Sequence, residues 1–216
     1  MPDLDDAQLR ALSGDEPFDR ARSHDTPEVV ERKRAAQGAD HVAPFEVWRT
    51  DMLGAMRRAG VSEPDAHLPH VDPLSGGVHA RLVVLQEAPG ATTLASAGGT
   101  GITSPDNDDP VSERLWRLCN EAGLARHEVV HWNCVAWAKD LKLERALVRA
   151  TLRRWLQVME GPTRVVLLGT AAKGFRPDVR SGLPEAEITD VLSSASRVAL
   201  ADARVDSSIV AALRGW

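Results

Sequence analysis

The sequence has no tyrosine and only two cysteines among its 216 residues. Cys119 and Cys134 are neither spaced as metal ligands nor numerous enough for a disulfide framework, so buried free thiols are expected. The mean hydropathy is −0.24 and the chain contains no long apolar run, which excludes a membrane-spanning segment. The acidic first residues lack the charged-then-apolar pattern of an export signal, so a cytoplasmic protein is predicted.

Acidic residues outnumber basic ones, 31 to 26. The formal net charge is −5, which is not the charge of a protein that holds nucleic acid by its overall field. Only four of the 26 basic residues are lysines, and a GC-rich genome explains this excess of arginine better than an arginine-specific function does. Charge therefore leaves DNA binding open, provided that a local basic face exists.

The hydrophobic pattern divides the chain into two parts. Residues 1–42 are polar and weakly periodic and predict a partly mobile N-terminal extension with helical stretches at 5–12 and 27–37. Residues 43–216 predict one domain that starts with an amphipathic helix at 43–60. Strands then alternate with helices, which predicts a three-layer α/β/α sandwich around a four-stranded, mainly parallel sheet. The predicted strands are 79–86, 127–137, 163–169 and 187–192, and the predicted helices are 110–124, 142–161, 170–175 and 202–213.

Polar residues gather where these strands end. Glu87 follows the first strand and Asn133 lies near the end of the second, while Ser193 and Ser194 follow the fourth. Segment 88–109, after Glu87, is rich in small residues and cannot pack a core. Because functional groups of such folds lie beyond the carboxyl ends of the strands, the sequence predicts a site at this edge of the sheet.

Four motifs stand at these strand ends: QEAPG, VVHWNCVAW, RVVLLGTAA and LSSASRVALADARVDSSIVAAL. Their order and spacing resemble the uracil-DNA glycosylase superfamily over residues 68–216, closest to the branch whose first motif reads Gly-Glu-Ala-Pro-Gly. The resemblance implies a monofunctional DNA glycosylase, expected to be a monomer, with DNA as its partner. The iron–sulfur relatives need four cysteines, so no cluster, metal or other cofactor is expected here.

The resemblance also implies roles for residues of the first two motifs. Glu87 would stabilise the cationic sugar and orient the attacking water, with Ala88 and Pro89 shaping the turn beside the base. Asn133 would read the Watson–Crick edge of the flipped base through its amide. The alternative interpretation, from the residues alone, gives both a structural role: Glu87 would cap nearby N–H groups, and Asn133 would hold a loop in place.

The segment SPDNDDP, residues 104–110, supplies further carboxylates. Asp109 precedes Pro110 and predicts a helix N-cap. Asp106 lies in a loop that faces the sugar and base in relatives, and it is the second catalytic candidate, with Asp108 behind it.

The last motif departs from the superfamily pattern His-Pro-Ser. Aligning the following arginine on Arg197 places Ser193 where a histidine normally donates to the leaving base, and losing such a donor typically costs about 100-fold in rate. We keep Ser193 as a base-binding candidate, and Ser194, Ser196 and Arg197 as candidates for contact with DNA.

By register with Gly101, the resemblance places Ile102 where relatives have the aromatic residue that stacks on the base, and we keep Ile102 as a base-binding candidate. Three explanations are open: a degenerate DNA-binding module, a slow uracil-excising repair enzyme, or a pocket rebuilt for another base. The third explanation accounts for the loss of both the histidine and the aromatic residue. On this explanation the chain resembles an antiviral branch of the superfamily that removes glucosylated hydroxymethylcytosine from phage DNA. A cytosine-type base needs a proton donor to leave. The hypothesis is that a carboxyl group with a raised pKa, either Glu87 or Asp106, supplies this proton.

Overall fold

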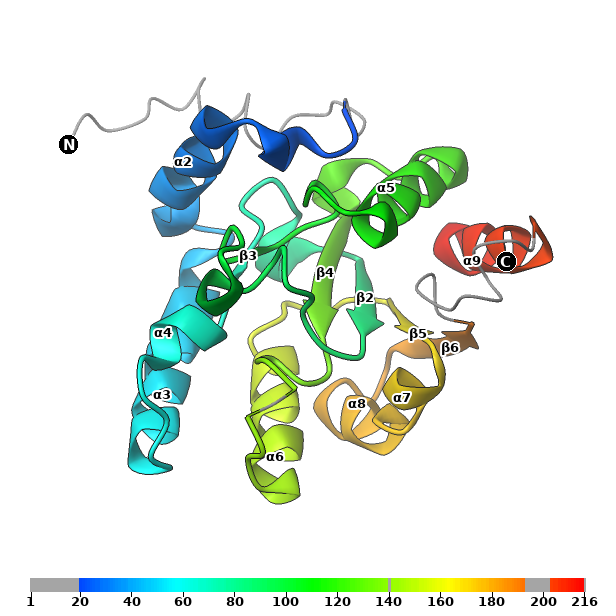
Figure 1. Cartoon of the computed structure of the whole chain (residues 1–216). Coiled ribbons are helices and arrows are strands. Elements are labelled where there is room, and N and C mark those ends of the chain that lie inside the picture. The colour runs from blue at the N-terminus through cyan, green and yellow to red at the C-terminus, as the bar shows by residue number, and fades with distance from the viewer. Residues whose placement is uncertain (1–19, 140, 193–202, 216) are drawn as a thin grey trace.

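The computed structural model describes residues 20–139, 141–192 and 203–215 (Figure 1). The described ranges leave out the predicted helical stretch 5–12. They also leave out four candidate residues of the last motif: Ser193, Ser194, Ser196 and Arg197. The helices in these ranges are α2 (Pro27–Ala35), α3 (Ala43–Arg58), α4 (Pro64–His67), α5 (Pro110–Ala122), α6 (Arg145–Leu156), α7 (Thr170–Lys173), α8 (Arg176–Gly182) and α9 (Ala203–Arg214). The strands are β1 (His70–Val71), β2 (Leu82–Gln86), β3 (Ile102–Thr103), β4 (Val129–Asn133), β5 (Arg164–Leu168) and β6 (Glu187–Val191).

The main sheet confirms the predicted fold class. It has four strands in the order β4-β2-β5-β6, and every pair is parallel. Each predicted strand and each following helix is present, although β4 is shorter than the predicted 127–137. The strands are almost continuously apolar because helices cover both faces of a parallel sheet. The fold is therefore α/β, with a parallel sheet flanked by helices.

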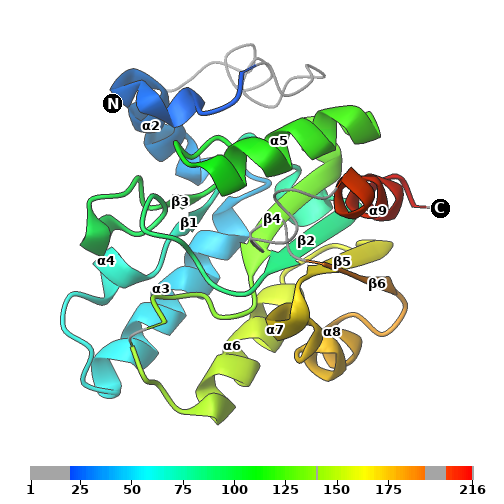
Figure 2. The same cartoon turned by 45° about the vertical axis from the view of Figure 1, so that its right-hand side comes forward.

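Alternate strand residues build two cores. Leu85 of β2 and Trp132 of β4 point into a core covered by α3 and α6, where the ring of Trp155 stacks on Trp132 at 5.2 Å between centroids. Leu82 and Val84 face the opposite side, under α5 and α9. Helices α5 and α9 pack against each other there, side by side in both views (Figure 2). The period of two along each strand therefore decides which helix layer a side chain meets.

Helix α5 begins and ends as its sequence predicts. The Asp109 carboxylate accepts hydrogen bonds from the backbone N–H groups of Val111 and Ser112, both at 2.9 Å, which confirms it as the N-cap. The helix ends at Gly123, whose φ of 72° is a left-handed conformation that glycine adopts without strain. This helix start forms one side of the site described below.

A second, two-stranded parallel sheet was not predicted. Segment 62–77 contains α4 and β1, and β1 pairs with β3. Ile102 of β3 lies opposite His70 and is fully buried. Two-residue strands have no periodicity to read in a sequence, so this pairing depends on tertiary contacts.

The described part of the N-terminal extension, residues 20–42, packs against the rest of the chain. Helix α2 matches the predicted helix at 27–37, and its Lys33 is buried, with only 1% of the side chain exposed. The division of the chain at residue 42 stays a prediction.

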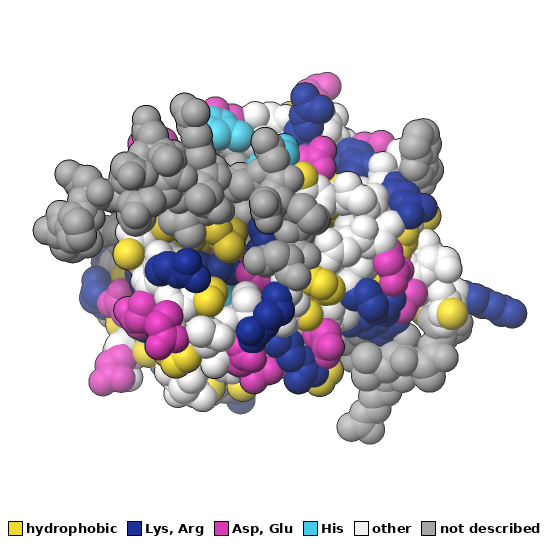
Figure 3. Space-filling view, turned by 90° about the horizontal axis from the view of Figure 1, so that it is seen from above, with side chains coloured by type: hydrophobic (Ala, Val, Ile, Leu, Met, Phe, Trp, Pro, Cys, Tyr) yellow, Lys and Arg dark blue, Asp and Glu magenta, His cyan; other side chains and the backbone are white. Residues whose placement is uncertain are grey.

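The protein surface mixes charges of both signs. On the face seen in Figure 3, basic and acidic side chains are interspersed, in agreement with the net charge of −5. Across the described ranges, no helix is long and apolar enough to cross a membrane.

Candidate active site

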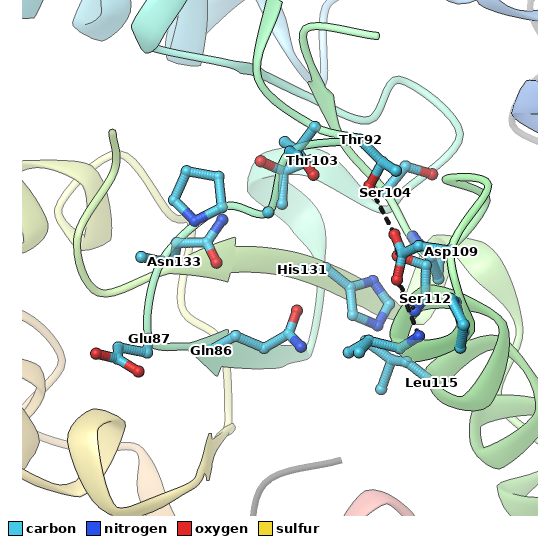
Figure 4. Close-up of a pocket in the computed structure, with 18 of the residues that line it drawn as sticks. Gln86, Glu87, Thr92, Thr103, Ser104, Asp109, Ser112, Leu115, His131 and Asn133 are labelled. Atoms are coloured by element: carbon cyan, nitrogen blue, oxygen red, sulfur yellow. Dashed lines mark hydrogen bonds between the residues drawn. The ribbon is translucent and has the colours of Figure 1, made fainter. Parts of the chain in front are cut away.

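A pocket of about 440 Å³ opens at the carboxyl ends of β2 and β4 (Figure 4). The loop after β2 and residues 103–105 form its walls, and the first turn of α5 closes one side. Its volume falls within the ~300–1,000 Å³ range of sites for small ligands. The pocket thus occupies the edge of the sheet at which the sequence predicts a site.

Glu87 lies at the mouth of this pocket. Its side chain is 46% exposed and its Oε1 is 2.8 Å from Nζ of Lys139. The backbone around it is held in place, since the Gln86 and Glu87 carbonyls accept hydrogen bonds from the N–H groups of Cys134 and Val135 at 2.8 and 2.9 Å. The carboxylate is therefore fixed by its backbone, solvent-accessible and next to a positive charge.

Asn133 forms part of the pocket lining and is 3% exposed. It lies opposite Gln86 in the β2–β4 register, so two carboxamides stand side by side at the strand ends. Within the described part of the chain, neither carboxamide makes a hydrogen bond to another protein group. A buried amide without a protein partner is costly unless water or a ligand satisfies it, which fits a group that binds ligand.

His131 is a pocket residue to which the sequence analysis gave no role. It precedes Asn133 by two positions on β4, so both side chains point to the same face of the sheet, and the period of two could have revealed this. Its Nε2 lies 3.7 Å from Sγ of Cys119. Burial lowers the pKa of His131 to about 4, so the imidazole is neutral at pH 7. Both cysteines are free and buried, as predicted.

Hydroxyl groups line the side of the pocket next to α5. Thr92 and Ser112 donate to Oδ2 of Asp109 at 2.7 and 2.8 Å, and all three residues line the pocket. Asp109 therefore serves two functions: it caps α5 and orients two hydroxyls toward the cavity (Figure 4).

Comparison with known families decides which class of protein has this arrangement. The model of the Uracil DNA glycosylase superfamily matches residues 73–204. The chain belongs to this superfamily. A search of curated proteins found no significant match. Members of the superfamily are typically DNA N-glycosylases, so base excision from DNA is the implied activity. Glu87, Ala88, Pro89 and Asn133, to which the resemblance gave roles, all line the pocket of this superfamily member.

Asp106 does not line the pocket, in contrast to the expectation for a catalytic group of this superfamily. Its carboxylate is fully buried and accepts hydrogen bonds from Lys33 and Arg126, both at 2.7 Å. Burial by itself raises the pKa of Asp106, but the positive charges of Lys33 and Arg126 outweigh it and hold the pKa below its ordinary value. The hypothesis of a raised pKa at Asp106 is therefore wrong. A catalytic role for Asp106 stays a prediction.

Ile102 also lies away from the pocket, because β3 turns its side chain into the protein interior. The neighbouring residues Thr103, Ser104 and Pro105 form the wall instead. Asp108, the reserve candidate, is on the surface with Arg22 at 3.5 Å. Loop residues adjacent in sequence thus have different environments, which the superfamily resemblance did not resolve.

Ser193, Ser194, Ser196 and Arg197, near the start of the last motif, lie outside the described residues, and the roles suggested for these side chains remain predictions. Among the residues that are described, no group of three or more His, Cys, Asp or Glu side chains is placed to hold a metal ion.

Proposed function

We propose that this protein is a monofunctional DNA glycosylase that flips a modified pyrimidine into the pocket and hydrolyses its N-glycosidic bond, leaving an abasic site. The favoured substrate is a bulky modified cytosine, such as glucosylated hydroxymethylcytosine of phage DNA, which implies a role in antiviral defence. The observation that carries the proposal is the juxtaposition of a buried, unpartnered Asn133 amide with the Glu87 carboxylate at one pocket.

Glu87 is proposed to act on the sugar. In base hydrolysis the bond between C1′ and the base nitrogen breaks, the base leaves with the electron pair, and positive charge develops on the sugar ring. A carboxylate at the pocket mouth stabilises that charge and orients the water, whose oxygen bonds to C1′ while one of its protons ends on the departing base. Nζ of Lys139 lies 2.8 Å from the Glu87 carboxylate and places a positive charge beside it.

Asn133 is proposed to bind the base. A carboxamide offers both an N–H donor and a carbonyl acceptor, so it pairs with the Watson–Crick edge of a pyrimidine. Asn133 belongs to a buried strand, so its backbone is already fixed before the base enters the pocket. Little entropy is therefore lost in orienting the amide when the base binds. The amide alone fits uracil as well as cytosine derivatives.

The proposed substrate rests on the shape and lining of the pocket. Its volume of about 440 Å³ leaves room beyond a bare pyrimidine, and the walls carry small hydroxyl residues such as Thr92, Thr93 and Ser112. With Ile102 turned into the interior, no aromatic ring from β3 closes over the base. These features support a substrate larger and more polar than uracil.

The test measures alkali-induced strand breaks in three DNAs incubated with purified protein. They are a uracil-containing duplex, phage DNA with glucosylated hydroxymethylcytosine, and unmodified DNA. Breaks only in the phage DNA are expected. The Glu87→Ala variant should lose activity by about 100-fold or more, whereas Glu185→Ala, which removes an exposed carboxylate far along the chain, should behave like wild type.

Two results would overturn the proposal in different ways. Breaks only at uracil would make the protein a repair glycosylase. No breaks in any DNA, together with tight binding to modified or abasic DNA, would make it a catalytically inactive binding module of the same fold.

A further inference from the structure

The pocket extends beyond Asn133 toward the first turn of α5. This end, which we call the α5-side subsite, is lined by Gln86, Thr92, Asp109, Ser112 and His131. In Figure 4 Thr92, Asp109, Ser112 and His131 lie on the opposite side of the cavity from Glu87. Gln86 lies next to Glu87 and directs its amide toward this group of residues. The sheet register places Gln86 beside Asn133, so the subsite adjoins the position proposed for the base.

The hydroxyls of this subsite can only accept hydrogen bonds from a ligand. A hydroxyl has one donor hydrogen and two lone pairs. Thr92 and Ser112 both direct their hydrogens to Oδ2 of Asp109, at 2.7 and 2.8 Å. Their oxygens therefore present lone pairs to the cavity, and a matching ligand must bring O–H or N–H donors.

The charge of the subsite excludes anions. The Asp109 carboxylate accepts hydrogen bonds from the backbone N–H groups of Val111 and Ser112 and from the hydroxyls of Thr92 and Ser112. Burial lowers the pKa of His131 to about 4, so this ring brings no compensating positive charge at neutral pH. An anionic group here would meet a carboxylate and several lone pairs, which is repulsive at close range.

Gln86 supplies both a hydrogen-bond donor and an acceptor to this subsite. Its carboxamide makes no hydrogen bond to another protein group in the described part of the chain, so it has both a donor and an acceptor for a ligand. Gln86 also stands where the resembling glycosylases have the first glycine of their Gly-Glu-Ala-Pro-Gly motif, and that glycine has no side chain to reach a ligand.

We propose that the α5-side subsite binds a neutral, hydroxyl-bearing substituent of the flipped base and that Gln86 and Ser112 determine this specificity. Ligand hydroxyls donate to the oxygens of Thr92, Ser112 and Gln86, and the Gln86 amide donates back to a ligand oxygen. A methyl substituent leaves these groups unpaired, and a carboxylate is repelled. The inference rests on the proposed function, because it assumes that a DNA base occupies the pocket.

The experiment compares duplexes that differ only in the substituent at C5 of one cytosine: glucosylated hydroxymethyl, hydroxymethyl, methyl or carboxyl. Single-turnover release of the base gives kcat/KM for each. The wild type should favour the hydroxyl-bearing substituents over methyl and carboxyl by about 100-fold. Gln86→Leu and Ser112→Ala should each lower the ratio of hydroxyl-bearing to methyl substrate by about tenfold. Gln157→Leu, at the exposed residue that follows α6, and Ser207→Ala, at an exposed position of α9, are the matched controls.

Binding separates failure of the subsite from failure of the proposed function. Fluorescence anisotropy with the same duplexes, in a Glu87→Gln background, should show the same preference and the same loss in the two variants. If no duplex loses a base but the binding preference appears, the glycosylase proposal fails and the subsite stands. A preference for carboxyl, or variants that weaken all substrates equally, overturns the subsite.

Discussion

Nζ of Lys33 lies 2.7 Å from Oδ2 of Asp106, although 73 positions separate the two residues in the chain and both side chains are buried. The same ammonium group also donates to Asp72 at 2.8 Å and to Oγ of Ser104 at 3.3 Å. Ser104 lines the pocket, whereas Lys33 belongs to α2, which precedes the segment matched by the superfamily. The N-terminal helix thus holds a wall of the candidate active site.

Replacing Lys33 by Met should strongly destabilise the protein. The change leaves the Asp72 and Asp106 carboxylates buried without their ammonium partner, and breaking such a buried pair costs about 3–5 kcal/mol. Urea unfolding followed by tryptophan fluorescence measures the free energy of unfolding. Lys142→Met, at an exposed position, is the control and should have little effect. A loss below about 1 kcal/mol for Lys33→Met would contradict this view of the cluster.

The same cluster should make stability fall in acid. Burial raises the pKa of Asp72 and Asp106, but the neighbouring charges of Lys33 and Arg126 win, so both folded-state pKa values are lowered. A carboxyl with a depressed folded pKa contributes stability above its unfolded pKa of about 4, and this contribution is lost as the pH falls toward the folded value. Urea unfolding between pH 5 and pH 2 measures it, and the curve of Lys33→Met should be flatter. Parallel curves would contradict the assignment.

His131 should produce a separate decline at higher pH. Its pKa is lowered by burial to about 4, against about 6.5 in the unfolded chain. Between these values the unfolded state binds a proton that the folded state does not, so stability falls as the pH drops, by up to about 3 kcal/mol. The pKa of His24 is also lowered, chiefly by burial, and contributes in the same direction.

The measurement for His131 is the free energy of unfolding from pH 7.5 to 4.5. His131→Gln should reduce the pH dependence in this interval, whereas His127→Gln, at an exposed position, should leave the wild-type slope. An unchanged slope in His131→Gln would show that the imidazole is not held neutral by burial.

Two buried asparagines should respond oppositely to substitution by alanine. Asn133→Ala should lower kcat/KM by about 100-fold, as expected for loss of a preorganised hydrogen-bonding group. It should change stability little, because its amide binds no described protein group. Asn107 is bonded to His24 at 2.8 Å and to Thr93 at 2.9 Å. Asn107→Ala should therefore cost about 2–4 kcal/mol of stability.

Base-release kinetics and urea unfolding of both asparagine variants test this contrast. If Asn133→Ala were the more destabilising of the two, its amide would have a structural rather than a ligand-binding role.

Local pattern was sufficient for much of the fold. Apolar runs of about five residues located β2, β4, β5 and β6, and the Asp109 cap and Gly123 delimited α5. Chain order and strand ends were also enough to place Glu87 and Asn133 at a common edge, because neighbouring parallel strands end together.

The errors came from residues whose environment is set by distant partners. Asp106 was expected at the catalytic centre, but Lys33 and Arg126 hold it in the interior. Ile102 was expected over the base, but its pairing with β1 turns it into the protein. His131 was given no role from the sequence, although it lines the pocket.

The sequence by itself determined the α/β class, the strand order along the chain, the superfamily and the two strand-end residues of the site. These follow from short-range periodicity and from motifs, which are properties of neighbouring residues. Only the tertiary structure decided which carboxylate faces the pocket and which is neutralised inside the protein. A side chain's charge state and direction depend on partners such as Lys33 and Asp106, brought together across 73 positions by folding.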